Sequence, residues 1–448
     1  MNNTCLHKIE KIEYNKIIIL CRNTKERGIK MNLKSNKAIT LVALIITIIV
    51  LLILAGVSLS MVLGENGLIN KAQSSVNRYK ESSENEQKLL NSIESYMDLQ
   101  LKSPGTKVDV PDGWNKDTVD AVLDDKKNII PVPKNFYYVG GNLDNGVIIS
   151  DNSADAYDGK VDKTTWEYTT SLAGNQFVWI PCTEEEYHKT DWGSKYVGVG
   201  YDKTGPNQAE IDKVKKYNGF YVARYEAGLA DGIAEYTKEQ ISDGVSSPDG
   251  YNSIGIPKSK AEKLPWNYIS YTNSKASAEK MYENNDCVTS GLITGTQWDV
   301  MLNKFIGKAN QSEVIPSEMD IKDSSKWGNY YNNSLTYTGR SATIFQSGNN
   351  WYIKQWGEKQ TNAFTKENTR IEFTTGACKD TEAYHVYDVA GNVWEWTDEE
   401  GQGSGYKVLR GGSSYDVSEI CPACCRLGNY AVSYMVCTFG FRVALYIK

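Results

Sequence analysis

The longest uninterrupted apolar run of the chain lies near its N-terminus. From Ala38 to Gly64 the sequence AITLVALIITIIVLLILAGVSLSMVLG contains no charged residue. As a helix this run is about 40 Å long, which exceeds the roughly 30 Å hydrocarbon core of a bilayer. Because a buried helix of a globular domain rarely runs this long without a polar face, the pattern predicts a transmembrane helix over residues 38–64.

Charged residues at the two ends of this run predict its orientation. Lys30, Lys34 and Lys37 precede the run, and Glu65 follows it. The positive-inside rule then places the basic residues 1–37 in the cytoplasm and residues 65–448 outside. We expect a single-pass protein of the cell membrane whose C-terminal part is extracytoplasmic. A compact leader, MNLKSNKAITL, begins at Met31, and we expect translation of the natural protein to start there.

The leader and the apolar run together resemble a type IV prepilin leader. A short Lys-rich stretch precedes Ala38-Ile39-Thr40-Leu41 and the long apolar helix. Two positions depart from the pilin pattern, because Ala38 stands where the prepilin peptidase needs Gly and Ala43 stands where pilins carry an assembly-guiding Glu. These departures favour a permanent anchor over cleavage. A pilin-like structural protein is kept as an alternative.

Beyond the apolar run, apolar positions first recur with the period of a solvent-exposed helix. This period ends before residue 103. Apolar side chains recur at a spacing near 3.6 at Leu68, Ala72, Val76 and Tyr79, and again at Leu89, Leu90, Ile93 and Met97. This predicts a helical stalk over residues 65–102. Residues 103–132 are rich in Pro, Gly, Asp and Lys, which predicts a linker.

From residue 133 onward, short aromatic and β-branched runs alternate with Gly, Asn and Asp, which predicts a separate domain over residues 133–448. The runs predict strands at Phe136–Gly140, Gly146–Ser150, Asn175–Pro181 and Gly219–Glu226. One helix is predicted from Ser274 to Glu283 with Asn273 as its N-cap. A second begins at Thr294, where Gln297 completes capping-box spacing, and its apolar side chains recur at Trp298, Met301, Leu302 and Phe305. Few helices among many short strands give an α+β fold.

The net charge and the numbers of histidines and cysteines limit the partners and metal sites that this chain can have. The formal net charge is −6. Residues 1–37 carry nine Lys/Arg and three Glu, so the remainder carries −12, which argues against a nucleic-acid partner. Only three histidines are present, and the nine cysteines show no paired CxxC motifs, which excludes a His-rich or Cys-paired metal site. The 29 tyrosines against 9 phenylalanines suit a recognition surface.

Four motifs resemble the formylglycine-generating-enzyme (sulfatase-modifying factor) family. The sequence YDVAGNVWEWT at residues 387–397 is similar to the family's G-N-V-W-E-W signature, and LRGGS at 409–413 and GFRVA at 440–444 follow it. Upstream, GFYVARYEAG at 219–228 is similar to an early strand of the same fold. The resemblance covers about residues 130–448 and implies the family's variant of the C-type-lectin-like fold, with many short strands and few helices.

The resemblance also implies where chemistry would occur. The family often binds calcium at the G-N-V-W-E-W turn, which makes Asn392 a candidate calcium ligand. Its oxidase members bind copper with two cysteines, five residues apart, just after Gly-Gly-Ser. Here Asp416 stands at the first position and Cys421 at the second. Copper is therefore not expected, and no catalytic residue is expected. The alternative is a formylglycine-generating oxidase that acts on a substrate cysteine, with Cys421 as its only catalytic residue.

Residues 414–439 lie between the matched motifs and resemble the variable region of lectin-fold targets of diversity-generating retroelements. Adenine mutagenesis of AAC-type codons reaches only certain amino acids, and of these 26 residues only Glu419 and Met435 fall outside that set. We therefore predict a binding face for an unknown protein or glycan ligand at the cell surface. Its ligand-binding residues are predicted to be Tyr415, Asp416, Cys421, Cys425, Tyr430 and Tyr434.

Overall fold

The computed structural model describes residues 36–63, 68–196, 204–235, 247–308, 316–337, 343–347, 350–354, 364–366, 368 and 370–448. The chain divides into two units, Met1–Met97 and Asp98–Lys448, and each is described here by itself. The predicted start at Met31 and nearly all of the basic segment 1–37 lie outside the described residues.

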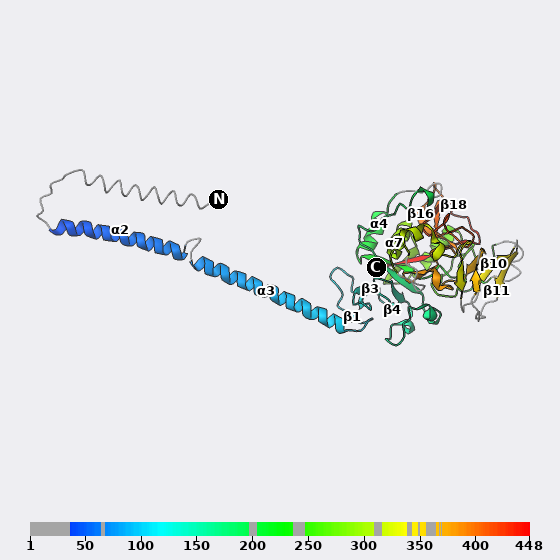
Figure 1. The fold of residues 1–448 in the computed structure, drawn as a ribbon, viewed down its shortest axis with the longest axis horizontal. Coiled ribbons are helices and arrows are strands. Elements are labelled where there is room, and N and C mark those ends of the chain that lie inside the picture. The colour runs from blue at the N-terminus through cyan, green and yellow to red at the C-terminus, as the bar shows by residue number, and fades with distance from the viewer. Residues whose placement is uncertain are drawn as a thin grey trace. The chain divides into compact units, whose positions relative to one another are not determined.

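The first unit contains two helices, α2 (Asn36–Leu63) and α3 (Leu68–Leu101) (Figure 1). Within α2, residues Val42–Leu59 have a mean hydropathy of 3.1, which is long and apolar enough for one membrane crossing by length and composition. The apolar side chains of this stretch are exposed on the helix, as expected for a segment that a lipid phase would surround. Within the predicted stalk, Leu68–Leu101 is helical, in agreement with its apolar period near 3.6.

The prediction of a linker at residues 103–132 is wrong. This stretch forms a three-stranded antiparallel sheet in the order β1-β2-β3, with β1 at Lys107–Val108, β2 at Val119–Leu123 and β3 at Ile129–Pro133. Val119, Val122, Ile130 and Val132 are buried in the main hydrophobic core. Pro111 and Gly113 lie in the connection between β1 and β2, whereas residues 124–128 form the turn between β2 and β3 without either residue type. Strand β2 has buried residues on both of its faces.

A six-stranded antiparallel sheet has the order β4-β5-β6-β7-β20-β8. Its strands are β4 (Tyr137–Gly140), β5 (Val147–Ser150), β6 (Gln176–Pro181), β7 (Gly219–Ala223), β20 (Val443–Ile447) and β8 (Val288–Leu292). The strands predicted from the sequence near residues 136, 146 and 175 are present. The one predicted at Gly219–Glu226 ends at Ala223, because the chain bends there and buries the charged groups of Arg224 and Glu226.

A second, four-stranded sheet has the order β18-β17-β16-β19. It contains β16 (Trp394–Glu400), β17 (Tyr406–Arg410), β18 (Arg426–Ala431) and β19 (Phe439–Phe441). β16 runs parallel to β19 and antiparallel to β17. Residues 394–400 therefore form a central strand of this sheet, and the alternating Trp394 and Trp396 are both buried in the core.

The remaining elements are short and lie between these sheets in the sequence. They are η1 (Ser153–Asp155), η2 (Trp166–Ser171), η3 (Ser194–Tyr196), α4 (Gln208–Lys215), α6 (Tyr271–Lys280), α7 (Gly295–Phe305), α8 (Glu318–Lys322), η4 (Ser324–Lys326), β9 (Leu335–Tyr337), β10 (Thr343–Ser347), β11 (Asn350–Lys354), β12 (Phe364–Lys366), β13 (Ile371–Phe373), η5 (Lys379–Thr381), β14 (Glu382–Ala383) and β15 (Val386–Tyr387).

The two predicted helices differ in how well their starts were placed. α7 begins at the predicted Thr294 N-cap, with the capping box to Gln297 formed in both directions. α6 begins three residues earlier than predicted, because Ser270 is its N-cap and accepts from the Asn273 backbone N–H. The Asn273 side chain instead donates to Asn252 Oδ1 at 2.9 Å.

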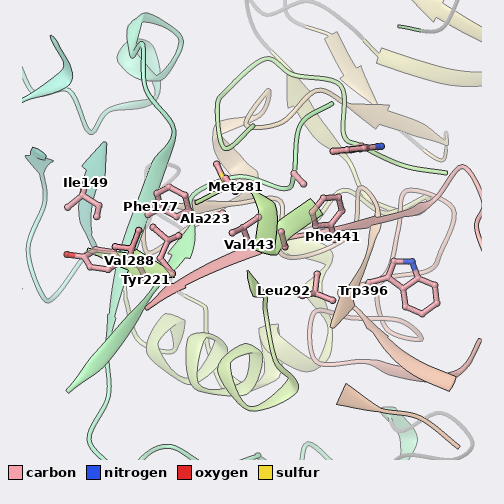
Figure 2. Packing of buried hydrophobic residues seen from close by; sticks show 14 of the residues in the cluster. Ile149, Phe177, Tyr221, Ala223, Met281, Val288, Leu292, Trp396, Phe441 and Val443 are labelled. Atoms are coloured by element: carbon pink, nitrogen blue, oxygen red, sulfur yellow. The ribbon is translucent and has the colours of Figure 1, made fainter. Parts of the chain in front are cut away.

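The main core joins the two sheets. Figure 2 shows Phe177, Tyr221 and Val443 from the six-stranded sheet packed in the cluster that also holds Trp396 and Phe441 of the four-stranded sheet. Burial of large aromatic side chains is the dominant favourable term in such a core. The many short strands with few helices confirm the predicted α+β architecture.

Arg442 lies at the point where the chain leaves β19 and enters β20. Its guanidinium is fully buried and binds Glu395 of β16 with two bonds, at 3.0 Å from Nε and 2.6 Å from Nη2. It also donates to the carbonyl oxygens of Ala223 (3.1 Å) and Tyr387 (2.9 Å). One side chain therefore ties the end of β7, the strand β15 and the strand β16 to the C-terminal segment.

We predict that Arg442→Met lowers the free energy of unfolding by about 3–5 kcal/mol, because it leaves the Glu395 carboxyl buried without its partner. Denaturant unfolding monitored by Trp fluorescence measures this loss. The double variant Arg442→Met/Glu395→Met is expected to recover part of it. A single variant as stable as the parent protein would contradict the role given to this pair.

Candidate functional site

The backbone after β17 turns sharply at two glycines. Gly411 and Gly412 adopt φ values of +90° and +77°, in the left-handed region that favours glycine. A Cβ atom at Gly412 would collide with the carbonyl oxygen of Cys421. The carbonyl oxygen of Gly411 accepts a 2.6 Å hydrogen bond from the buried Tyr330 hydroxyl. The start of the segment 411–425 is therefore fixed by backbone geometry and by a residue outside it.

Side chains from other parts of the domain hold the rest of this segment. Trp298 Nε1 of α7 donates to the Ala423 carbonyl at 2.9 Å, and Ser324 Oγ accepts from the Ala423 N–H at 3.0 Å. Asn332 Oδ1 accepts from the Ser418 N–H at 3.0 Å. Each of these bonds goes to the main chain of the segment, so side chains from outside the segment support its path.

Arg410 also supports the segment, and its guanidinium belongs to a cluster of buried charged side chains. Its Nε donates to the Cys425 carbonyl at 3.0 Å, and its guanidinium pairs with Asp299 at 2.7 Å and with Glu399 at 3.3 Å. Arg426 pairs with the same two carboxylates, at 3.4 Å from Glu399. Lys189 also pairs with Glu399, at 3.1 Å, so three positive side chains and two buried carboxylates meet at the base of the loop.

The predicted residue Tyr415 lies half-buried above this base. The guanidinium of Arg370 lies 4.8 Å from the centroid of the Tyr415 ring and 5.6 Å from that of Tyr331. Burial raises the pKa of the Tyr415 hydroxyl above its ordinary value. Neither Arg370 nor Tyr331 belongs to residues 414–439, and the Tyr331 N–H bonds to the Asp416 carbonyl at 2.9 Å.

Asp416, Cys421 and Cys425 are neighbours in the structure. Asp416 Oδ2 accepts hydrogen bonds from the N–H (2.9 Å) and the hydroxyl (2.6 Å) of Ser413. The Cys421 thiol interacts with the Cys425 thiol and with the Asp416 carboxyl group, and these neighbours together with burial raise the pKa of Cys421. A second thiol therefore lies beside Cys421, although the residue at the first family position is Asp416.

The predicted residues differ in their access to solvent. Tyr434 is 46% exposed, and its ring lies tilted against that of Tyr430 at a centroid distance of 5.0 Å; both rings also contact Phe439. Cys425 is only 7% exposed and packs in the core, so the structure does not support the prediction that it contacts a ligand. Its place in the turn that follows Pro422 buries it, which the spacing of cysteines could not reveal.

We call Tyr331, Arg370, Tyr415, Asp416, Ile420, Cys421, Tyr430 and Tyr434 the C-terminal face. Ile420 is 60% exposed and was not singled out from the sequence. Tyr331 and Arg370 were missed because they lie far from residues 414–439 in the chain. No periodicity marks them, and tertiary contacts such as the bond between Tyr331 and Asp416 and the packing of Arg370 on Tyr415 bring them to the face.

The candidate calcium ligand Asn392 is part of a buried hydrogen-bonded turn. Its Oδ1 accepts from Asn329 Nδ2 at 2.9 Å and from the Phe373 N–H at 2.8 Å, and its Nδ2 donates to Glu226 Oε2 at 2.6 Å. Both lone pairs of Oδ1 are thus used, which does not fit a calcium ligand at this atom. Calcium binding at Asn392 stays a prediction that this arrangement does not favour.

Buried carboxyl groups surround that turn. Burial raises the pKa of Glu226, and it raises the pKa of Asp388 to about 6 although Gly376 and Thr381 donate to it. Among the residues that the structure describes, no group of three or more His, Cys, Asp or Glu side chains is placed to hold a metal ion. The turn therefore acts as a scaffold, and the Asn392 carbonyl accepts from the Ser414 N–H at 3.0 Å.

We predict that Gly412→Ala lowers the free energy of unfolding by at least about 2 kcal/mol, because a side chain there is strained at positive φ and meets the Cys421 carbonyl. The matched control is Gly403→Ala, where an added Cβ has no atom within 4 Å and a change within about 0.5 kcal/mol is expected. Thermal and denaturant unfolding compare the two. Equal effects would show that the loop is not fixed at Gly412.

Three solved structures are similar in part: the crystal structure of CarF (13% identity, 62% of this chain and 100% of that chain, TM-score 0.30), PvdO from Pseudomonas aeruginosa (12%, 61% and 95%, 0.30), and Treponema denticola variable protein 1 (15%, 50% and 95%, 0.25). A comparison with curated proteins finds no match.

The family comparison covers more than half of the chain. Residues 193–447 match the sulfatase-modifying factor enzyme 1-like domain. The match includes β7, the turn at Asn392, the Gly411–Ser413 turn and the C-terminal strand β20, which are the parts that the motifs singled out. The fold is accordingly the C-type-lectin-like fold of the formylglycine-generating enzymes. This chain belongs to the family of the sulfatase-modifying factor enzyme 1-like domain.

Proposed function

We propose that this chain is a membrane-anchored, extracytoplasmic binding protein whose C-terminal face contacts a ligand. The single observation that carries the proposal is the way in which residues 411–425 are held. Tyr330, Trp298, Ser324 and Arg410 all bond to main-chain atoms of that segment. The exposed apolar side chain of Ile420 in this segment is therefore replaceable without moving the backbone, which is what a surface adapted to new ligands needs.

The side chains of the C-terminal face favour a protein ligand over a glycan. The exposed Ile420 and Tyr434 offer apolar area, and the Tyr430 ring packs against that of Tyr434. Tyr and Arg are the residues enriched at protein–protein hot spots, because they bury large area while keeping a polar group. The composition of residues 414–439 supports diversification of this face, which we include in the proposal.

The proposed location rests on the N-terminal region. Helix α2 contains one stretch long and apolar enough to cross a membrane. Lys30, Lys34 and Lys37 on one side and Glu65 on the other support an outside location for the family domain. The single-pass anchor followed by helix α3 would then present the domain at the cell surface.

We predict that Ile420→Ala/Tyr434→Ala lowers affinity for a bound peptide at least about tenfold while shifting the melting temperature by under about 2 °C, because both side chains are exposed. The peptides are selected from a phage-displayed random library on the full chain in detergent micelles. Binding to each variant is measured by biolayer interferometry.

Tyr168→Ala is the matched control for this experiment, since Tyr168 is 40% exposed and lies in η2, outside the C-terminal face. Selected peptides that bind the double variant as tightly as the parent chain would place the binding face elsewhere. Asp416→Ala is not a suitable surface variant, because its bonds to Ser413 hold the turn.

The contact between Cys421 and Cys425 favours a second candidate, oxidation of a substrate cysteine. In the oxidase members that this chain resembles, copper chemistry needs two thiolates. Here the pair would be Cys421 and Cys425, but their surroundings favour the protonated thiol at Cys421. Asp416 at the first family position also removes the sulfur that the oxidases use.

We therefore expect no oxygen uptake when the full chain is given monovalent copper and a Cys-containing peptide. An oxygen electrode and mass spectrometry of the peptide are the measurements. Cys421→Ser serves as the matched variant and is expected to behave like the parent chain. Uptake that stops in Cys421→Ser would establish the oxidase and refute the binding-only proposal.

A further inference from the structure

A groove separate from the C-terminal face lies between the small β1–β2–β3 sheet and the edge of the six-stranded sheet. Its cavity has a volume of about 470 Å³, which is within the range of roughly 300–1,000 Å³ that is usual for small-molecule sites. Asp120 and Val122 of β2 and Val132 of β3 form one wall. Residues 134–138 and Tyr157 form the other.

Aromatic rings shape this groove. Tyr138 and Tyr157 lie with ring centroids 5.8 Å apart, and Tyr137 is 36% exposed beside them. Gly105, at φ +79°, packs against both rings, since a Cβ atom there would lie 3.4 Å from Tyr138 and 3.6 Å from Tyr157. Phe136 and Tyr138 belong to the main core, so the aromatic wall is anchored before any ligand arrives.

The charged groups of the groove leave one positive charge uncompensated. Asp120 is neutralised by Lys107, with a distance of 2.6 Å between Nζ and Oδ2. Lys134 is half-buried and lines the same groove, and it forms no ion pair with any residue that the structure describes. The exposed Asn135 next to it adds an amide donor and acceptor.

We propose that this groove is a second binding site and that its ligand is an acidic saccharide. The apolar face of a sugar ring packs on the Tyr137 and Tyr157 rings, and its hydroxyl groups bond to Asp120 and Asn135. A single carboxylate on the sugar pairs with the Lys134 ammonium. A phosphate group is less well served, because one ammonium beside a carboxylate lacks the several donors that phosphate recognition uses.

An array of immobilised uronic-acid and sialic-acid oligosaccharides, with neutral oligosaccharides of matched length, tests the proposal with the full chain in detergent micelles. We expect binding to the acidic oligosaccharides, and we expect added salt to weaken it. The Lys134→Gln variant is expected to weaken it about tenfold or more. Tyr137→Ala is expected to weaken it as well. Lys116→Gln and Tyr168→Ala, which alter exposed side chains outside the groove, are the matched controls.

Each result decides the proposal. Absence of binding to every acidic oligosaccharide would overturn it, and so would equal binding of acidic and neutral ones. Binding that Lys134→Gln leaves unchanged would also overturn it. Competition by inorganic phosphate at equal charge concentration would assign the Lys134 position to a free anion instead. The peptide experiment on the C-terminal face is independent of all these outcomes, because the two sites share no residue.

Discussion

The Arg442–Glu395 ion pair is the interaction on which the rest of the domain depends. The last strands, β19 and β20, belong to different sheets and are separated by Arg442 alone. A fully buried guanidinium must satisfy five N–H donors, and here the Glu395 carboxylate and two carbonyl oxygens accept from it. This requirement fixes how the two sheets meet, and through β16 and β17 it fixes where the loop after Arg410 begins.

The need to pair buried polar groups also explains how the C-terminal face is held. A main-chain carbonyl or N–H without a partner is costly. In the irregular segment 411–425 some of these groups bond within the segment, and others need side chains outside it. Trp298, Arg410 and Tyr330 meet that need. These three residues are fully buried, whereas Ile420 of the same segment is 60% exposed and takes no part in this support.

The two proposed sites differ in their physical character. The C-terminal face is open and is formed by tyrosines, an isoleucine and an arginine drawn from several segments. The groove beside β1–β3 is concave, rests on the core, and carries one uncompensated ammonium at Lys134. An extended face suits a protein surface, and a preformed groove suits a small polar ring. A surface-anchored protein with both would engage a protein and an acidic glycan independently.

The sequence by itself determined what local pattern and motif can encode. An uncharged run of 27 residues predicted helix α2, capping-box spacing predicted the start of α7, and alternating apolar residues predicted β4, β5 and β6. The motifs predicted the family. Only the tertiary structure decided that residues 103–132 form a packed sheet, that Cys425 is buried beside Cys421, and that Tyr331 and Arg370 join the face. These outcomes depend on burial and on contacts between distant segments, which no local pattern records.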